Sequence, residues 1–119
     1  MFEIKVAAEF SGAHKLREYQ GRCEKLHGHN WKVEVIVSGA KLNKTGLLID
    51  FRKIKSQLKK IIDKLDHKYL NELDYFKKFN PTSENIAKYI YDSLRKRISA
   101  LKSVTVWESS DSSARYYDK

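Results

Sequence analysis

Cysteine, proline and long hydrophobic runs are all scarce in this chain. Cys23 is the single cysteine, so no disulfide bond can form within the chain. No stretch approaches the roughly 18 apolar residues that a membrane-spanning helix needs. The segment Met1–Lys5 also lacks the basic and then apolar order of a signal peptide. We therefore expect a soluble cytoplasmic protein.

The charge balance is strongly basic. Twenty-four Lys and Arg residues stand against 15 Asp and Glu residues, which gives a formal net charge of +9 over 119 residues. Such a charge can mark a nucleic-acid binder, a site for a polyanionic small molecule, or simply a basic surface. The sequence contains no RNA-binding signature, no paired-cysteine zinc finger and no arginine-rich arm. Most of the lysines fall on expected solvent-facing sides of helices, so a solvated surface is the favoured interpretation.

The spacing of apolar residues predicts a single domain over residues 1–119. Alternation with a period of two predicts four strands, at residues 2–13, 28–38, 101–108 and 113–117. Spacings of three and four predict two helices, one capped by Asp50 with an apolar face up to Leu65, and one capped by Thr82 or Ser83 and ending near residue 98. Residues 72–80 are expected to connect them. This order predicts an α+β fold, ββααββ, in which a four-stranded antiparallel sheet carries two helices on one face.

Three of the four histidines are predicted to converge. His27 and His29 lie two apart at the start of a predicted strand, so their side chains point to the same face. An antiparallel partner strand over residues 2–13 would bring His14 to the same place. Three neutral imidazoles that leave a fourth position open are typical of a catalytic zinc site. The alternative is that these are surface or strand-filling histidines without a metal.

A second group of residues has the chemistry of proton transfer. Asp66 and His67 are adjacent at a predicted helix end, where a carboxylate can orient an imidazole as a general base. A nearby thiol would be activated as thiolate, and the position of Cys23 four residues before His27 favours this role over that of a small buried residue. The alternative for His67 is a structural interaction with the carboxyl end of the helix.

These residues belong to six blocks that together resemble the superfamily of 6-pyruvoyltetrahydropterin synthase and 6-carboxytetrahydropterin synthase. The blocks cover nearly the whole chain and are Phe10–His14, Cys23–Asn30, Ile49–Phe51, Leu65–Asn71, Pro81–Asn85 and Val106–Glu108. The resemblance implies the tunnelling fold, in which trimers form a barrel and two trimers stack as a hexamer with shared active sites. It also implies zinc on His14, His27 and His29, with Cys23, Asp66 and His67 as the proton-transfer groups.

The resemblance further implies a substrate, 7,8-dihydroneopterin triphosphate. The pterin is expected on Glu108, because a carboxylate can accept two hydrogen bonds from its guanidine-like edge. Thr82, Ser83 and Glu84 match another part of the family's pocket, although Glu84 is also a normal residue for the first turn of a helix. A triphosphate needs cations, and the expected ones are Lys15 and Arg17, which closely follow His14.

The spacing of Cys23 and His27 bears on the product. Three intervening residues resemble the carboxy enzymes, which release 6-carboxy-5,6,7,8-tetrahydropterin, acetaldehyde and triphosphate in the 7-deazaguanine pathway to queuosine and archaeosine. The pyruvoyl enzymes, which form 6-pyruvoyltetrahydropterin and are one alternative for this chain, typically have five intervening residues. Glu24 occupies a position at which a third subgroup uses glutamate to form 6-hydroxymethyl-dihydropterin, so a dual-activity enzyme is an alternative. Two further alternatives are a pterin- or purine-binding relative without activity, and a basic nucleic-acid-binding module with a structural metal.

Overall fold

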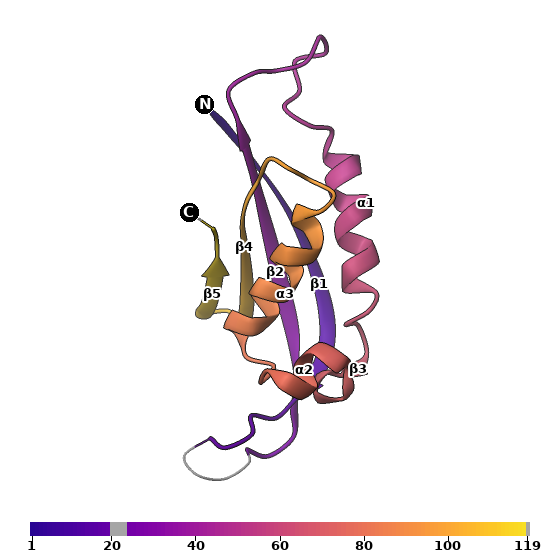
Figure 1. The fold of residues 1–119 in the computed structure, drawn as a ribbon, viewed down its shortest axis with the longest axis vertical. Coiled ribbons are helices and arrows are strands. Elements are labelled where there is room, and N and C mark those ends of the chain that lie inside the picture. Colours follow the sequence, from indigo (N-terminus) through magenta and orange to yellow (C-terminus); the bar gives the residue numbers. More distant parts are fainter. Residues whose placement is uncertain (20–23, 119) are drawn as a thin grey trace.

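The fold is a twisted sheet with helices on one face (Figure 1). This computed structural model describes residues 1–19 and 24–118. Cys23, for which we predict a catalytic role, lies outside the described residues. Its strands are β1 (Phe2–His14), β2 (His27–Gly39), β3 (Lys68–Tyr69), β4 (Leu101–Ser109) and β5 (Ser112–Tyr116). Its helices are α1 (Phe51–Ile62), a 3-10 turn η1 (Leu70–Glu72), α2 (Asp74–Lys78) and α3 (Ser83–Arg95).

The sheet has the strand order β3-β1-β2-β4-β5. Strands β1 and β2 form a long antiparallel pair in unbroken register from Phe2 opposite Gly39 to His14 opposite His27. This pairing follows from the alternation in both segments, because a shift of one residue would turn their buried residues to the other face. The pairing places the carboxyl end of β1 beside the amino end of β2.

The two long helices cover one face of this sheet (Figure 1). Helix α1 packs on β1, and α3 packs on β4 and β5. Buried side chains from α1, α3 and β2 form the centre of the core, and they include Ile54, Leu58, Ile86, Ile90, Leu94, Val33, Val35 and Val37. Among the described residues, no helix is long and apolar enough to cross a membrane.

Two features differ from the predicted ββααββ order. A fifth strand, β3, runs parallel to β1, with Gly12 opposite Lys68 and Ala13 opposite Tyr69. It has only two residues, too few for alternation to reveal it. The expected connector at residues 72–80 contains α2, whose Phe76 is fully buried. Burial of one large aromatic side chain stabilises a helix that is too short to show a periodic face.

Each predicted long helix extends about one turn beyond its end in the structure. Helix α1 ends at Ile62, and Leu65 is buried from the turn that follows. Helix α3 ends at Arg95, and Ile98 is likewise buried beyond the helix. In both cases one more apolar residue after the helix end is buried in the core. The apolar spacing in the sequence therefore continues beyond the last helical residue.

Both long helices begin with a side-chain cap. The Asp50 carboxylate accepts a hydrogen bond from the Arg52 amide at 2.9 Å, which confirms the predicted cap of α1. For α3 the cap is Thr82, whose hydroxyl oxygen accepts from the Asn85 amide at 3.1 Å. Thr82 follows Pro81, and the Pro81 carbonyl contacts His14 at 2.7 Å. The start of α3 therefore holds part of the histidine cluster in place.

Replacing Thr82 tests the contribution of the α3 cap to stability. We expect Thr82→Ala to lower the free energy of unfolding by about 1 kcal/mol, because one amide of the first turn loses its acceptor. Thr82→Ser should retain most of the stability, and Thr45→Ala, in an exposed turn, serves as the control. Urea denaturation followed by circular dichroism measures the difference. Equal stability of Thr82→Ala and the wild type would show that the cap contributes nothing.

Candidate metal centre and active site

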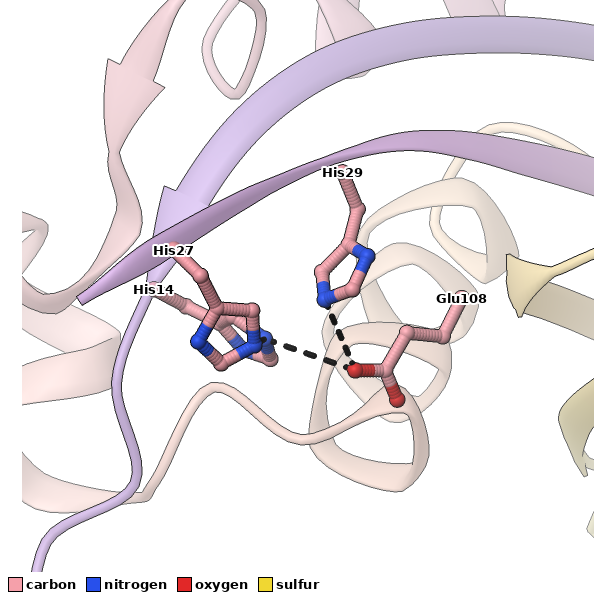
Figure 2. Close-up of side chains that lie close together, drawn as sticks. All are labelled: His14, His27, His29 and Glu108. Atoms are coloured by element: carbon pink, nitrogen blue, oxygen red, sulfur yellow. Dashed lines mark hydrogen bonds and ion pairs between the residues drawn. The ribbon is translucent and has the colours of Figure 1, made fainter. Parts of the chain in front are cut away.

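Three histidines and one glutamate meet where β1 ends and β2 begins. His14 is the last residue of β1 and lies opposite His27, the first residue of β2. His29 follows on the same face of β2, and Glu108 reaches the cluster from β4 (Figure 2). One ligand atom from each of the four residues lies within 4.8 Å of the other three. The predicted convergence of the histidines is thus a feature of the structure.

Trp31 forms the floor beneath two of the imidazoles. Its ring lies edge to face with His14 at a centroid distance of 4.9 Å and with His29 at 5.2 Å. The indole nitrogen donates to the Gly12 carbonyl oxygen at 3.1 Å, which fixes the ring against β1. The His14 side chain is only 3% exposed. The cluster is therefore anchored in the core at one end of the sheet.

Two backbone carbonyls fix which imidazole nitrogens carry a proton. Nδ1 of His14 lies 2.7 Å from the Pro81 carbonyl oxygen, and Nδ1 of His27 lies 2.8 Å from that of Lys25. A carbonyl oxygen only accepts hydrogen bonds, so each Nδ1 must donate. In the neutral tautomer each Nε2 then has a free lone pair, which is the arrangement found in metal-ligating histidines.

These free lone pairs face one another. Nε2 of His14 and Nε2 of His27 are 3.0 Å apart, a distance at which two acceptors repel unless a cation lies between them. Nε2 of His29 is buried and has no aligned hydrogen-bond partner, although the Glu108 carboxylate is 2.9 Å away. Buried polar atoms without partners are costly. Three imidazole nitrogens and a carboxylate oxygen fit a divalent transition metal, and these four residues can hold a metal ion.

Glu108 enters the cluster at an irregularity of the sheet. Trp107 pairs with Ser113 and Ser109 pairs with Ser112, so the register shifts at the residue between them. A bulge of this kind redirects one side chain and is common beside active sites. Glu108 lies 2.9 Å from Nε2 of His29 and 3.6 Å from Nε2 of His14. Sequence reasoning places Glu108 at the pterin and did not anticipate its position beside the imidazoles.

Asp66 and His67 form the expected pair. The Asp66 carboxylate lies 3.0 Å from Nδ1 of His67 and accepts from the Ser11 amide at 2.9 Å. The hydrogen bond from Ser11, with the nearby His67, lowers the pKa of Asp66. His67 has a left-handed backbone, with φ of 58°, and donates its amide to the Ser11 carbonyl. Its side chain is 81% exposed, so the imidazole is oriented by Asp66 and open to a reactant.

The Asp66–His67 pair is separate from the metal-binding group within one chain, and His67 lines a cavity beside the paired ends of β1 and β2. A cavity of about 530 Å³ is lined by nine residues that include both His29 and His67. Its other lining residues are Ser11, Gly12, Ala13, Gly28, Asn30, Lys68 and Tyr69. Ser11, Ala13, Gly28 and Asn30 alternate along β1 and β2 with the residues that carry the imidazoles, so this cavity lies mainly on the strand face opposite the histidine cluster.

Glu24 lies on the outer side of His27. Its carboxylate is 3.8 Å from Nδ1 of His27 and accepts from the Leu16 amide at 3.3 Å. The free Nε2 of His27 points away from Nδ1, toward His14. Glu24 therefore adjoins the outer edge of His27 and is not one of the four residues that can hold the metal.

The two expected phosphate ligands have different surroundings. The Arg17 guanidinium donates to the Phe76 carbonyl at 2.6 Å, so it is used in attaching this loop to α2. The Lys15 ammonium has no ion-pair partner among the described residues, while its backbone is held by the Asn71 side chain. Asn80 holds the backbone of Arg17 in the same way. Asn71 and Asn80 thus fix the loop after His14, a role that their sequence positions beside turns did not reveal.

The segment at the start of α3 has mixed surroundings. The Thr82 hydroxyl oxygen caps the helix, Ser83 is buried with 9% of its surface exposed, and Glu84 is exposed in the first turn. The carbonyl of Pro81 contacts His14 directly. This segment therefore adjoins the cluster through its backbone.

Burial of His14 predicts a pH-dependent stability of the metal-free protein. Burial lowers the pKa of His14 below its ordinary 6.5, and the hydrogen bond to Pro81 opposes this only in part. Below pH 6.5 the unfolded chain binds a proton that the folded protein excludes, so stability should fall as the pH decreases from about 6.5. Urea unfolding of chelator-treated protein between about pH 7.5 and pH 5.5 measures the loss. His14→Gln should reduce this loss of stability, and a loss unaffected by His14→Gln contradicts this origin.

Comparison with known proteins identifies the family. The sequence model of 6-pyruvoyl tetrahydropterin synthase matches residues 3–119. The 6-carboxy-5,6,7,8-tetrahydropterin synthase of Synechocystis sp. is 38% identical and covers 98% of this chain and 94% of its own. The dihydroneopterin monophosphate aldolase of Pyrococcus furiosus is 37% identical, with 87% of each chain covered. The structure of 6-pyruvoyl tetrahydropterin synthase from Caenorhabditis elegans superposes with a TM-score of 0.87 at 25% identity, over 99% of this chain and 96% of the other.

The superposition confirms the predicted tunnelling fold, with the short β3 and α2 as additions to the expected elements. The sequence match covers all six blocks on which the resemblance was based. The chain belongs to the 6-pyruvoyl tetrahydropterin synthase family and is a pterin synthase, a lyase of that family.

Proposed function

We propose that this protein is a zinc-dependent 6-carboxytetrahydropterin synthase. It converts 7,8-dihydroneopterin triphosphate and one water molecule to 6-carboxy-5,6,7,8-tetrahydropterin, acetaldehyde and triphosphate, as an early step toward 7-deazaguanine bases of tRNA. The observation that carries the proposal is the cluster of three imidazoles, two of them with Nε2 lone pairs freed by backbone carbonyls, on a chain similar to the carboxy enzyme of Synechocystis sp.. The spacing of Cys23 and His27 supports the same product.

The proposed metal ligands are His14, His27 and His29. Zinc suits this donor set, because three neutral imidazoles are a common catalytic zinc site. When bound, the zinc polarises the hydroxyl groups of the substrate side chain and makes the neighbouring protons more acidic. The Pro81 and Lys25 carbonyls keep two of the imidazoles in the tautomer that zinc requires.

The pterin ring is proposed to bind Glu108. The carboxylate accepts two N–H groups from the guanidine-like edge of the ring, side by side. Thr82, Ser83 and Glu84 are proposed to line the same pocket, and the contact of Pro81 with His14 supports their nearness to the cluster. Binding the ring at one end leaves the substrate side chain to extend toward the imidazoles.

Proton transfer is assigned to Cys23 and the Asp66–His67 pair. Cys23, as a thiolate, removes a proton from the substrate side chain, and His67 transfers protons on the other face. Asp66 supports this role, because its carboxylate orients Nδ1 of His67 at 3.0 Å and leaves the opposite nitrogen for the substrate. The ring of His67 is 81% exposed, which suits a group that completes the site of a neighbouring subunit. We propose a homohexamer of two trimers with shared active sites.

The triphosphate is proposed to bind cations near the loop after His14. Lys15 is the better of the two expected residues, because its ammonium has no ion-pair partner in the described part of the chain. Arg17 is already bound to the Phe76 carbonyl and would contribute through the shape of the loop. The net charge of +9 would also draw a polyanionic substrate to the protein.

Incubation of the zinc-loaded protein with 7,8-dihydroneopterin triphosphate tests the proposed function. We expect 6-carboxy-5,6,7,8-tetrahydropterin and acetaldehyde in equal amounts, identified by mass spectrometry. The metal-free protein and His29→Ala should form neither product. Absence of any turnover by verified zinc-loaded protein would contradict the proposal, and salt-sensitive binding of nucleic acid by the same protein would then favour the basic binding module.

A second product, 6-hydroxymethyl-dihydropterin, is proposed as a minor activity. Its support is Glu24, a second carboxylate within 3.8 Å of His27, together with the similarity to a protein named dihydroneopterin monophosphate aldolase. A carboxylate and a thiolate are different bases, so Glu24 offers a second group that can accept a proton beside His27. The two bases would then lead to different products.

Single substitutions separate the two bases. We expect Cys23→Ala to abolish the carboxy product and to leave zinc binding and any hydroxymethyl product largely intact. Glu24→Ala should remove only the hydroxymethyl product. Product analysis by mass, with zinc content measured for each variant, makes the comparison. Full carboxy-product activity of Cys23→Ala would remove the thiol from the mechanism.

A further inference from the structure

We propose that Glu108 is an exchangeable fourth ligand of the metal. In the substrate-free enzyme its carboxylate closes the coordination shell of the three histidines, and the incoming pterin draws it away and opens that position. This inference rests on the proposed function for the identity of the pterin. The ligand role of Glu108 without substrate rests on the geometry of the cluster alone.

The carboxylate already lies at ligand distance from a shared centre. Oε1 of Glu108 is 2.9 Å from Nε2 of His29 and 3.6 Å from Nε2 of His14 (Figure 2). The approach of Glu108 to His29 does not have hydrogen-bond geometry, and Nε2 of His29 is buried without a hydrogen-bond partner. Two atoms with lone pairs that lie close together without a hydrogen bond between them can both coordinate one metal ion. Three nitrogens and one carboxylate oxygen complete the four-coordinate shell that zinc prefers in closed sites.

Glu108 is the ligand that can leave. His14 and His27 are each held by a second contact, to the carbonyls of Pro81 and Lys25. The Glu108 carboxylate has no hydrogen-bond or ion-pair partner among the described residues other than His14 and His29. Its side chain is 36% exposed, against 3% for His14. It also stands at the register shift between β4 and β5, where the backbone is not fixed by regular pairing.

The two roles of Glu108 exclude each other. Recognition of the guanidine-like edge of a pterin uses both carboxylate oxygens side by side. Oε1 cannot accept from that edge while it lies among the imidazoles, 2.9 Å from His29. Binding of the ring therefore removes the carboxylate from the metal, and the vacated position becomes available to the substrate side chain. The metal is activated only when a pterin is present.

Cobalt(II) substitution tests this exchange, because the visible absorption of cobalt(II) reports its coordination number and ligands. The proteins compared are the wild type, Glu108→Gln and the charge-matched control Glu9→Gln, which lies on an exposed strand position. We expect Glu108→Gln to weaken zinc and cobalt binding by at least about tenfold, and Glu9→Gln to leave both unchanged. Circular dichroism verifies that each variant is folded.

The second arm adds 7,8-dihydropterin, which has no side-chain hydroxyls and no phosphate. Its binding, followed by fluorescence, should change the cobalt spectrum of the wild type and of Glu9→Gln but not that of Glu108→Gln. Unchanged metal affinity in Glu108→Gln overturns the ligand role. Binding of the pterin without a spectral change, or no binding at all, overturns the exchange. A spectral exchange in a protein that forms no carboxy product would support the inference and contradict the proposed function, so the two failures are distinguishable.

Discussion

The antiparallel register of β1 and β2 is the constraint on which the rest of the site depends. It sets His14 opposite His27 at the end of an unbroken ladder, and the period of the strand then directs His29 to the same face. A slip of one residue would turn the buried side chains of β1 to solvent and separate the imidazoles. The hydrophobic core that enforces the register is therefore also what assembles the cluster.

Backbone carbonyls complete what the register begins. The Pro81 carbonyl precedes the cap of α3, and the Lys25 carbonyl lies in the loop that leads into β2. Each accepts from an Nδ1 and leaves the corresponding Nε2 free, so the lone pairs converge at distances that are unfavourable without a cation. Asn71 and Asn80 hold the loop after His14 against the rest of the chain. Small polar contacts thus set the tautomers of two of the three clustered histidines, His14 and His27.

The histidine cluster and the main elements could be predicted because they depend on local periods. Alternation in the strands, three- and four-residue spacing in the helices and the cap at Asp50 are all properties of short segments. Features that depend on single long-range contacts could not be predicted. Strand β3 has two residues, α2 is stabilised by one buried phenylalanine, and Arg17 is engaged by a carbonyl of α2.

Glu108 shows the same limit at the centre of the site. The position of Glu108 in a strand was predictable. The direction of its side chain, however, follows from a register shift between β4 and β5, which no sequence pattern predicts. Its distance of 2.9 Å from His29 changes the chemistry of the site, since it turns three ligands into four. The proposed function and the proposed exchange both follow from this one cluster, in which a fixed set of imidazoles meets one movable carboxylate.

We propose that one metal ion is held by the Nε2 atoms of His14, His27 and His29. X-ray absorption spectroscopy of the zinc-loaded protein at its zinc edge tests it most directly. We expect three imidazole nitrogens at about 2.0–2.1 Å and one oxygen at about 2.0–2.2 Å from the zinc, with no coordinating sulfur. A sulfur scatterer at about 2.3 Å, or fewer than three imidazoles, would contradict it.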